Sequence, residues 1–181
     1  MSVPQQAIDM VKKWEGLRHD TYLCSGNVLT IGYGTTARAG VGIVPVMGMT
    51  ITTSEAEYYL EKALDKFTAK IDPLFTAEIN DNERSAFISL AYNIGPGGFK
   101  RSSALRHFNA GNKDKAAKSI LMWNKAGGKK VQGLVNRRAD ESLLFLLPVT
   151  QEPAETPPEP ATGAFTGILA AIIAILKGFR K

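Results

Sequence analysis

A proline-rich segment divides the chain and limits how much of it can form a packed core. Residues 148–163, PVTQEPAETPPEPATG, contain five prolines and no aromatic residue. This composition is typical of a solvated, semi-extended linker. The preceding residues read as one domain, which is long enough for a well-buried core. We therefore predict a domain over 1–147, a linker over 148–163 and a tail over 164–181.

The predicted tail is apolar with a basic end. Thirteen residues from Ala164 to Leu176 are interrupted only by Thr166 and Gly167, and three basic residues follow. The stretch is shorter than the roughly 20 residues that a membrane-spanning helix needs. We expect a hydrophobic helix that contacts an anionic membrane or lipopolysaccharide. The alternatives are that the tail packs back onto the domain or forms oligomers.

Charge is distributed unevenly along the chain, whose net charge is +5. Residues 1–99 carry 8 Lys and Arg against 11 Asp and Glu, whereas residues 100–147 carry 11 against 3. A cationic lobe favours a polyanionic partner such as nucleic acid, an anionic membrane or a cell-wall polymer. No nucleic-acid-binding motif occurs, and the basic residues are not interleaved with aromatic ones, so we expect no nucleic-acid partner.

The N-terminal third combines one helix with a β-rich segment. Apolar residues at helical spacing follow Pro4 and end at Gly16, which predicts a helix between them. Residues 23–52 are rich in β-branched residues and glycine and predict a small β-hairpin subdomain. The fold class we expect is α+β, a mostly helical domain with this subdomain at its N-terminal end and a ligand cleft between the two.

The rest of the domain predicts five more helices. Two of them open with capping-box pairs, Ser54 with Glu57 and Asn80 with Glu83. Three helical patterns follow, over roughly 102–110, 113–124 and 133–147. Helices therefore account for nearly all of the chain between the β-rich segment and the linker.

Glu15, Cys24 and Thr30 place a carboxylate, a thiol and a hydroxyl in one short segment. The negative end of the helix dipole and the neighbouring Trp14 both disfavour a charged carboxylate at Glu15, which suits a general acid. Cleavage of a glycosidic bond needs such an acid on one face and a group that positions water on the other. A hairpin can bring the thiol and hydroxyl opposite the acid. The alternative is a solvated Glu15 and a Cys24 that is a small core residue.

The spacing of these residues resembles a catalytic pattern. Eight residues separate Glu15 from Cys24, five separate Cys24 from Thr30, and Thr30 begins the sequence TIGYG. This spacing is similar to the pattern of Glu, then Asp or Cys, then Thr in the phage lysozymes (endolysins) of glycoside hydrolase family 24. Two later segments resemble the same family in order: NERSAFISLAYNIGPGGFKRSSALRHFNAG, and AAKSILMWNKAGG followed by GLVNRRADE. The resemblance covers about residues 5–147 and implies a lysozyme-like domain.

The resemblance implies hydrolysis of the β-1,4 bond between N-acetylmuramic acid and N-acetylglucosamine in bacterial peptidoglycan. Glu15 would donate the proton, Cys24 would take the position of the aspartate, and Thr30 would help to hold the attacking water. A free thiol is mostly protonated near neutral pH, so we expect Cys24 to orient water, with an ionised or nucleophilic role as alternatives.

Three further residues are expected at the substrate. Arg137 or Arg138 should pair with Glu15, and Arg137 fits the Asn-Arg step of the family better. Gly34 and Phe99 are expected to contact sugar. The alternatives are that both arginines lie on the surface, that Phe99 belongs to the core and that Gly34 only permits a strand to bend.

No cofactor is expected. His19 and His107 are isolated from other ligand residues, so the sequence predicts no metal site. The N-terminus shows no secretory signal, and the family resemblance implies synthesis in the host cytoplasm, release through a holin and action as a monomer on the periplasmic cell wall. Two other functions stay open: a cationic protein that disrupts membranes without hydrolysis, and a lytic transglycosylase that acts on the same polymer.

Overall fold

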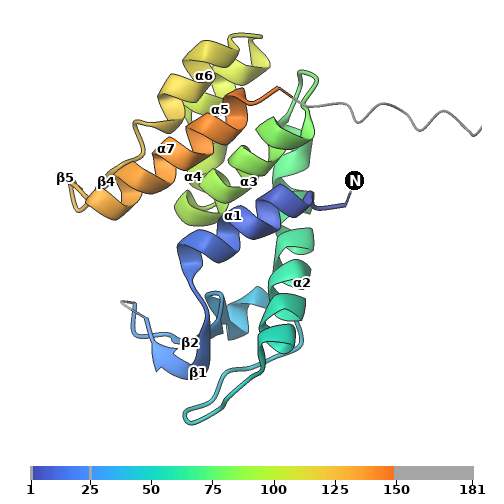
Figure 1. The fold of residues 1–181 in the computed structure, drawn as a ribbon, viewed down its shortest axis with the longest axis vertical. Coiled ribbons are helices and arrows are strands. Elements are labelled where there is room, and N and C mark those ends of the chain that lie inside the picture. The colour runs from blue at the N-terminus through green and yellow to red at the C-terminus, as the bar shows by residue number, and fades with distance from the viewer. Residues whose placement is uncertain (1, 25, 149–181) are drawn as a thin grey trace, which may run out of the picture. The chain divides into compact units, whose positions relative to one another are not determined.

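A central helix, α3 (Asp81–Ile94), organises the fold. The computed structural model of the protein describes residues 2–24 and 26–148. Nine consecutive residues of α3, Glu83–Ala91, are buried, so every face of this helix is covered over that stretch. Helices α1 (Gln5–Glu15) and α7 (Gln132–Leu146) pack against it (Figure 1). The helical part is therefore built around one element from the middle of the chain.

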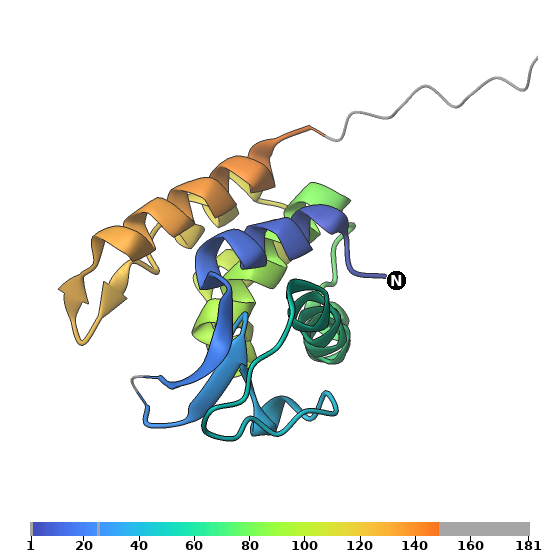
Figure 2. The same ribbon diagram turned by 60° about the horizontal axis from the view of Figure 1, so that its bottom comes forward.

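The remaining helices complete this part and connect it to the sheet. The longest, α2 (Thr53–Ile71), runs from the sheet to the helical part (Figures 1 and 2). The shorter helices are the 3-10 helices η1 (Ala37–Ala39) and η2 (Asp72–Leu74), and α4 (Pro96–Lys100), α5 (Ser103–Asn109) and α6 (Lys113–Ile120). The mixed α+β fold class expected from the sequence is confirmed.

An antiparallel sheet of three strands follows α1. Its order is β1 (Arg18–Leu23), β2 (Leu29–Gly32), β3 (Thr35–Thr36), and the register places Tyr22 opposite Thr30. The sheet begins at Arg18, five residues before the β-rich segment that the sequence predicted. The sequence RHDTYL has a charged start and little apolar alternation, so its strand character comes from its neighbours rather than from its own pattern.

The outer edge of β1 is paired with the loop that precedes α2. Thr21 N–H donates to Met49 O at 3.0 Å, and Ile51 N–H donates to His19 O at 3.0 Å. These bonds satisfy backbone groups that an edge strand would otherwise leave open. The end of the segment that leads into α2 is therefore tied to the sheet.

Five phenylalanine rings form the centre of the helical core. The ring of Phe87 on α3 lies 5.2 Å from Phe99, 5.3 Å from Phe108 and 4.9 Å from Phe145, centroid to centroid. Phe75 stacks on the same ring at 5.8 Å. Edge-to-face pairs of this kind add to the stabilisation that burial provides. Rings from four other elements or connections thus converge on one residue of α3.

One predicted helix start is wrong by two residues. The capping box of α2 is formed by Thr52 and Glu55: Glu55 N–H donates to the Thr52 hydroxyl, and Thr52 N–H donates to the Glu55 carboxylate at 2.8 Å. The predicted pair, Ser54 and Glu57, has the same spacing, but Glu57 instead pairs with Lys12 of α1. The predicted box of Asn80 and Glu83 at the start of α3 is confirmed.

The sequence prediction also missed a second hairpin and a short helix. The helix predicted over 113–124 ends at Ile120, because a two-stranded hairpin follows, with β4 (Lys125–Ala126) paired to β5 (Lys129–Lys130). Gly127 and Gly128 form its turn with φ of 55° and 78°, the left-handed values that a tight hairpin turn requires. The short helix α4 was likewise not predicted.

The predicted linker, apart from Pro148, and the predicted tail lie outside the described residues. In the described part of the chain, every helix is too short or too polar to cross a lipid bilayer.

Candidate active site

Glu15 is the last residue of α1. Gly16 follows with φ of 71°, a conformation that favours glycine, and the chain enters β1 only two residues after the helix ends. The Glu15 side chain keeps 24% of its surface exposed. The acid is therefore fixed at the point where the helical part joins the sheet, with part of its surface open to a ligand.

Arg137 holds one oxygen of this carboxyl group. Its Nη1 donates to Glu15 Oε1 at 2.8 Å, and the arginine side chain is only 4% exposed. The expected choice of Arg137 as the partner of Glu15 is confirmed, and the alternative in which both arginines lie on the surface is wrong, because Arg138 is also buried. A nearly buried guanidinium that donates to one oxygen sets the orientation of the whole carboxyl group.

The second oxygen of Glu15 faces the turn between β2 and β3. A β-carbon built on Gly34 would lie 3.7 Å from Glu15 Oε2, and Gly34 has φ of 86°. A larger residue here would be strained and would occupy the space beside this oxygen. Gly34 thus borders the free side of the acid, as its expected place near the substrate requires.

Arg137 is itself held by a buried carboxylate that sequence analysis missed. Glu141 has no exposed surface; its Oε1 accepts from Arg137 Nε at 3.1 Å, from Ser89 Oγ at 2.7 Å and from Arg138 Nη2 at 2.9 Å. Burial raises the pKa of Glu141, and the two arginines oppose this effect. The signal in the sequence was the i, i+4 spacing of Arg137 and Glu141 within NRRADE.

Cys24 and Thr30 lie at the far end of the β1–β2 hairpin. Cys24 N–H donates to Val28 O at 3.1 Å, and the buried Thr30 hydroxyl donates to Val28 O at 2.9 Å. Hydrogen bonds from the backbone of Val28 and Gly26, and then from the Thr30 side chain, lower the pKa of the Cys24 thiol. The hairpin thus brings the two predicted residues together around the carbonyl oxygen of Val28.

Tyr22 lies within reach of both the acid and the thiol. Tyr22 on β1 pairs with Thr30 on β2, and Cys24 follows the last residue of β1. Burial raises the pKa of Tyr22, Arg18 lowers it, and the negative charges of Cys24 and Glu15 raise it further. Tyr22 thus lies near both groups, on the strand that connects them in the chain.

The predicted role of Phe99 at the substrate is wrong. Phe99 is fully buried, and its ring packs against Phe87 and Phe75, so it has no surface that a sugar can touch. Tyr92 of α3, like Tyr22, does lie near Glu15, and its hydroxyl donates to Tyr33 O at 3.5 Å. Burial raises the pKa of Tyr92 to about 12, and the charge of Glu15 contributes to this shift.

Among the described residues, no group of three or more His, Cys, Asp and Glu side chains is arranged to hold a metal ion. The side chains described at this site are an acid with one free oxygen, a thiol with a lowered pKa and a hydroxyl. This set can transfer a proton on one side of a bound ligand and position water on the other.

Comparisons with known proteins match most of this chain. The phage lysozyme family model matches residues 12–141. The endolysin of Bacillus phage B103 is 38% identical over 148 residues, which are 81% of this chain and 54% of that protein. The endolysin of Salmonella phage P22 is 36% identical over 146 residues, which are 81% of this chain and 99% of the relative. The chain thus spans about half the length of the Bacillus phage endolysins that it matches.

Solved structures show the same fold. The endolysin from Escherichia coli O157:H7 phage FAHEc1 is 37% identical and superposes with a TM-score of 0.71, over 81% of this chain and 94% of that one. The matched residues include Glu15, the β1–β2 hairpin and Arg137 of α7. On these grounds the chain belongs to the phage lysozyme family.

Proposed function

We propose that the protein is an endolysin muramidase of glycoside hydrolase family 24, which hydrolyses the β-1,4 bond between N-acetylmuramic acid and N-acetylglucosamine in bacterial peptidoglycan. The observation that carries the proposal is the asymmetry at Glu15. One oxygen is bound to Arg137, and the other faces Gly34 without a protein partner among the described residues. A general acid needs this arrangement, since one oxygen must stay free to carry the proton.

The proton moves from Glu15 Oε2 to the bridging oxygen of the glycosidic bond. The bond from that oxygen to the anomeric carbon then breaks, and the carboxylate left behind stays paired with Arg137. Positive charge develops on the sugar ring, and a water molecule adds to the anomeric carbon from the opposite face. The products are two sugar chains, one with a new reducing end.

Cys24 and Thr30 hold the attacking water in this proposal. The lowered pKa of Cys24 increases the thiolate fraction at neutral pH, so the thiolate can take up the proton that the water loses. The Thr30 hydroxyl, which donates to Val28 O, can accept a hydrogen bond from the same water. The thiolate therefore adds base catalysis to the water-orienting role expected from the sequence.

Replacement of Glu15 by Gln should abolish hydrolysis and leave the fold intact. Gln keeps the shape of the side chain and can still bond to Arg137, but it carries no acidic proton. Release of reducing ends from purified peptidoglycan should fall by at least about 10²-fold, the lower limit expected for loss of a general acid. Substantial residual activity would refute the assignment.

The same assay separates the alternatives. Mass spectrometry of the wild-type products should show reducing muramic acid ends, whereas a lytic transglycosylase would leave anhydro-muramic acid. A protein that only disrupts membranes would release no sugar ends at all.

Replacement of Cys24 by Asp should preserve activity, whereas Cys24→Ser should lose about 10²-fold if the sulfur acts as a base. Wild-type activity should rise as the thiol ionises with increasing pH. Because a carboxyl group ionises near pH 4, that rising limb should move to lower pH in Cys24→Asp. An inactive Cys24→Asp together with a fully active Cys24→Ser would contradict the role given to Cys24.

Replacement of Glu141 by Gln should lower both stability and activity. It leaves two buried arginines without their carboxylate, a change that typically costs about 3–5 kcal/mol of unfolding free energy. Asp140→Asn is the matched control, because Asp140 lies on the same helix but pairs with Lys13 at the surface. Urea unfolding should show a loss below about 1 kcal/mol for the control. Equal losses of unfolding free energy in Glu141→Gln and Asp140→Asn would contradict the role given to Glu141.

Residues 164–181 form the second part of the proposal, which rests on their sequence. Their apolar stretch and basic end are suited to an anionic membrane surface. The full chain should co-sediment with anionic vesicles, and a truncation after Pro148 should not. Equal binding by the two proteins would exclude a membrane role for the tail.

A further inference from the structure

A basic cavity lies beside the proposed active site, between η1 and α2. Its volume is about 160 Å³, and its lining includes three cationic side chains, Arg38, Lys66 and Lys70. Two alanines and the rings of Phe67 and Tyr92 complete the wall. We call this cavity the η1–α2 pocket. Its polar groups are all donors, except for the phenol of Tyr92, and its walls are apolar.

The pocket is connected to Glu15 through a short series of contacts. Tyr92, which forms part of its wall, lies 3.5 Å from the carbonyl oxygen of Tyr33. Tyr33 precedes Gly34, and Gly34 borders the free oxygen of Glu15. Tyr92 thus connects the wall of the η1–α2 pocket to the β2–β3 turn that borders Glu15.

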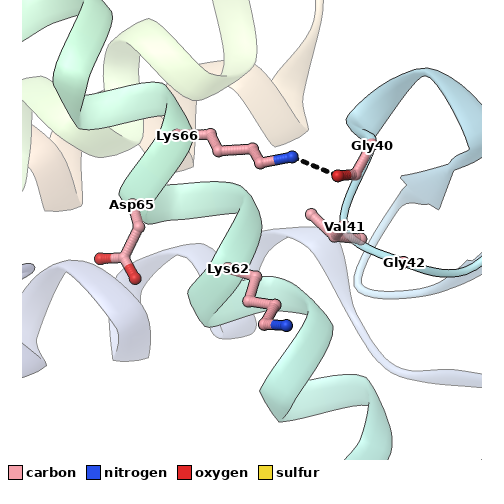
Figure 3. Close-up of a pocket in the computed structure, with 6 residues that line it drawn as sticks. All are labelled: Gly40, Val41, Gly42, Lys62, Asp65 and Lys66. Carbon is pink, nitrogen blue, oxygen red and sulfur yellow. Dashed lines mark hydrogen bonds between the residues drawn. The ribbon is translucent and has the colours of Figure 1, made fainter.

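The three cations are not neutralised by the protein. Among the residues that the structure describes, none of Arg38, Lys66 and Lys70 forms an ion pair with a carboxylate. Lys66 donates instead to the carbonyl oxygen of Gly40, which fixes its ammonium group beside η1 (Figure 3). The neighbouring Asp65 lines the cavity drawn in Figure 3 together with Lys62 and Lys66, but it forms no ion pair with them among the residues that the structure describes. Clustered cations without a counterion favour an anionic ligand.

Three lysines of α2 extend the cationic surface beyond the η1–α2 pocket. Lys62, Lys66 and Lys70 are spaced four residues apart on α2, so they lie on one side of that helix. Lys62 and Lys66 also line a second cavity of about 470 Å³ against Gly40–Gly42. Since Lys66 borders both cavities, an elongated ligand can extend from Tyr92 along α2.

We propose that the η1–α2 pocket binds a carboxylate of the peptide that is attached to muramic acid beside the cleaved bond. This inference rests on the proposed function. Peptidoglycan strands carry short peptides that combine small apolar side chains with free carboxylates, which match apolar walls and unpaired cations. The pocket is partly enclosed by Phe67 and Tyr92, which suits a group of side-chain size better than a flat membrane surface.

The test compares two substrates with the same glycosidic bonds: purified peptidoglycan, and glycan strands from the same wall whose peptides have been removed with an amidase. The variant is Lys66→Gln with Lys70→Gln in the full chain. Both residues are exposed, so the fold should be unaffected. The matched control is Lys125→Gln with Lys129→Gln on the exposed β4–β5 hairpin, which removes the same charge elsewhere.

The pocket variant should raise KM for intact peptidoglycan about tenfold, with kcat unchanged, and should cleave peptide-free strands as the wild type does. The control should match the wild type on both substrates. An equal change on both substrates, no change on either, or the same loss in the control would overturn the proposal. Wild-type protein that cleaves neither substrate would instead refute the proposed function itself.

Direct binding separates carboxylate recognition from general attraction to anions. Calorimetry with a free alanyl-glutamyl-diaminopimelyl tripeptide should show binding by the wild type that the pocket variant loses. The same tripeptide with amidated carboxylates should bind neither protein. Binding of the amidated peptide as tightly as the free peptide would contradict the assignment. So would a pocket variant that still binds the peptide but loses binding to an anionic glycerol-phosphate oligomer.

Discussion

The buried carboxylate of Glu141 and the two arginines around it connect the core of the protein to its acid. Glu141 accepts from Ser89 on α3 and from Arg137 and Arg138 on its own helix, and Arg137 extends from there to Glu15 on α1. Burying three charges is unfavourable unless each is paired, so this group stabilises only one arrangement of the three helices. The orientation of the acid therefore depends on the packing of α7 against α3. A change deep in the core can reach the site without touching the substrate.

Sequence and structure agree best where a residue has one possible role. Glu15 and Arg137 were predicted as a pair from their place in the family pattern, and the structure joins them at 2.8 Å. Helix starts were less certain, because two overlapping pairs share the capping-box spacing at the start of α2. Thr52 with Glu55 forms the cap, and Glu57 is left to bind Lys12 across to α1. Spacing alone contains no information about that tertiary contact.

The aromatic residues show that the order of residues in the sequence does not give the direction in which each side chain points. Phe99 and Tyr92 both belong to the segment that resembles the central helix and loop of the family, and each is a plausible neighbour of the substrate. Their places depend on the direction in which α3 and α4 turn each side chain. Phe99 points into the ring cluster around Phe87, whereas Tyr92 faces Tyr33 and the sheet. The strand β1 was missed for a related reason, since its partners are β2 and the distant segment around Met49.

Two residues, Gly16 and Leu17, are all that separate the helix that ends in the acid from the strand that leads to the thiol. No direct bond joins Glu15 to Cys24 among the described contacts: the acid is held by α7, and the thiol is held by its own hairpin. In the proposed mechanism, the sugar ring and the water molecule would therefore lie between two groups that are held independently. The short connection through Gly16 and Leu17 limits how far the hairpin can move from the end of α1, whereas α7 sets the direction of the acid.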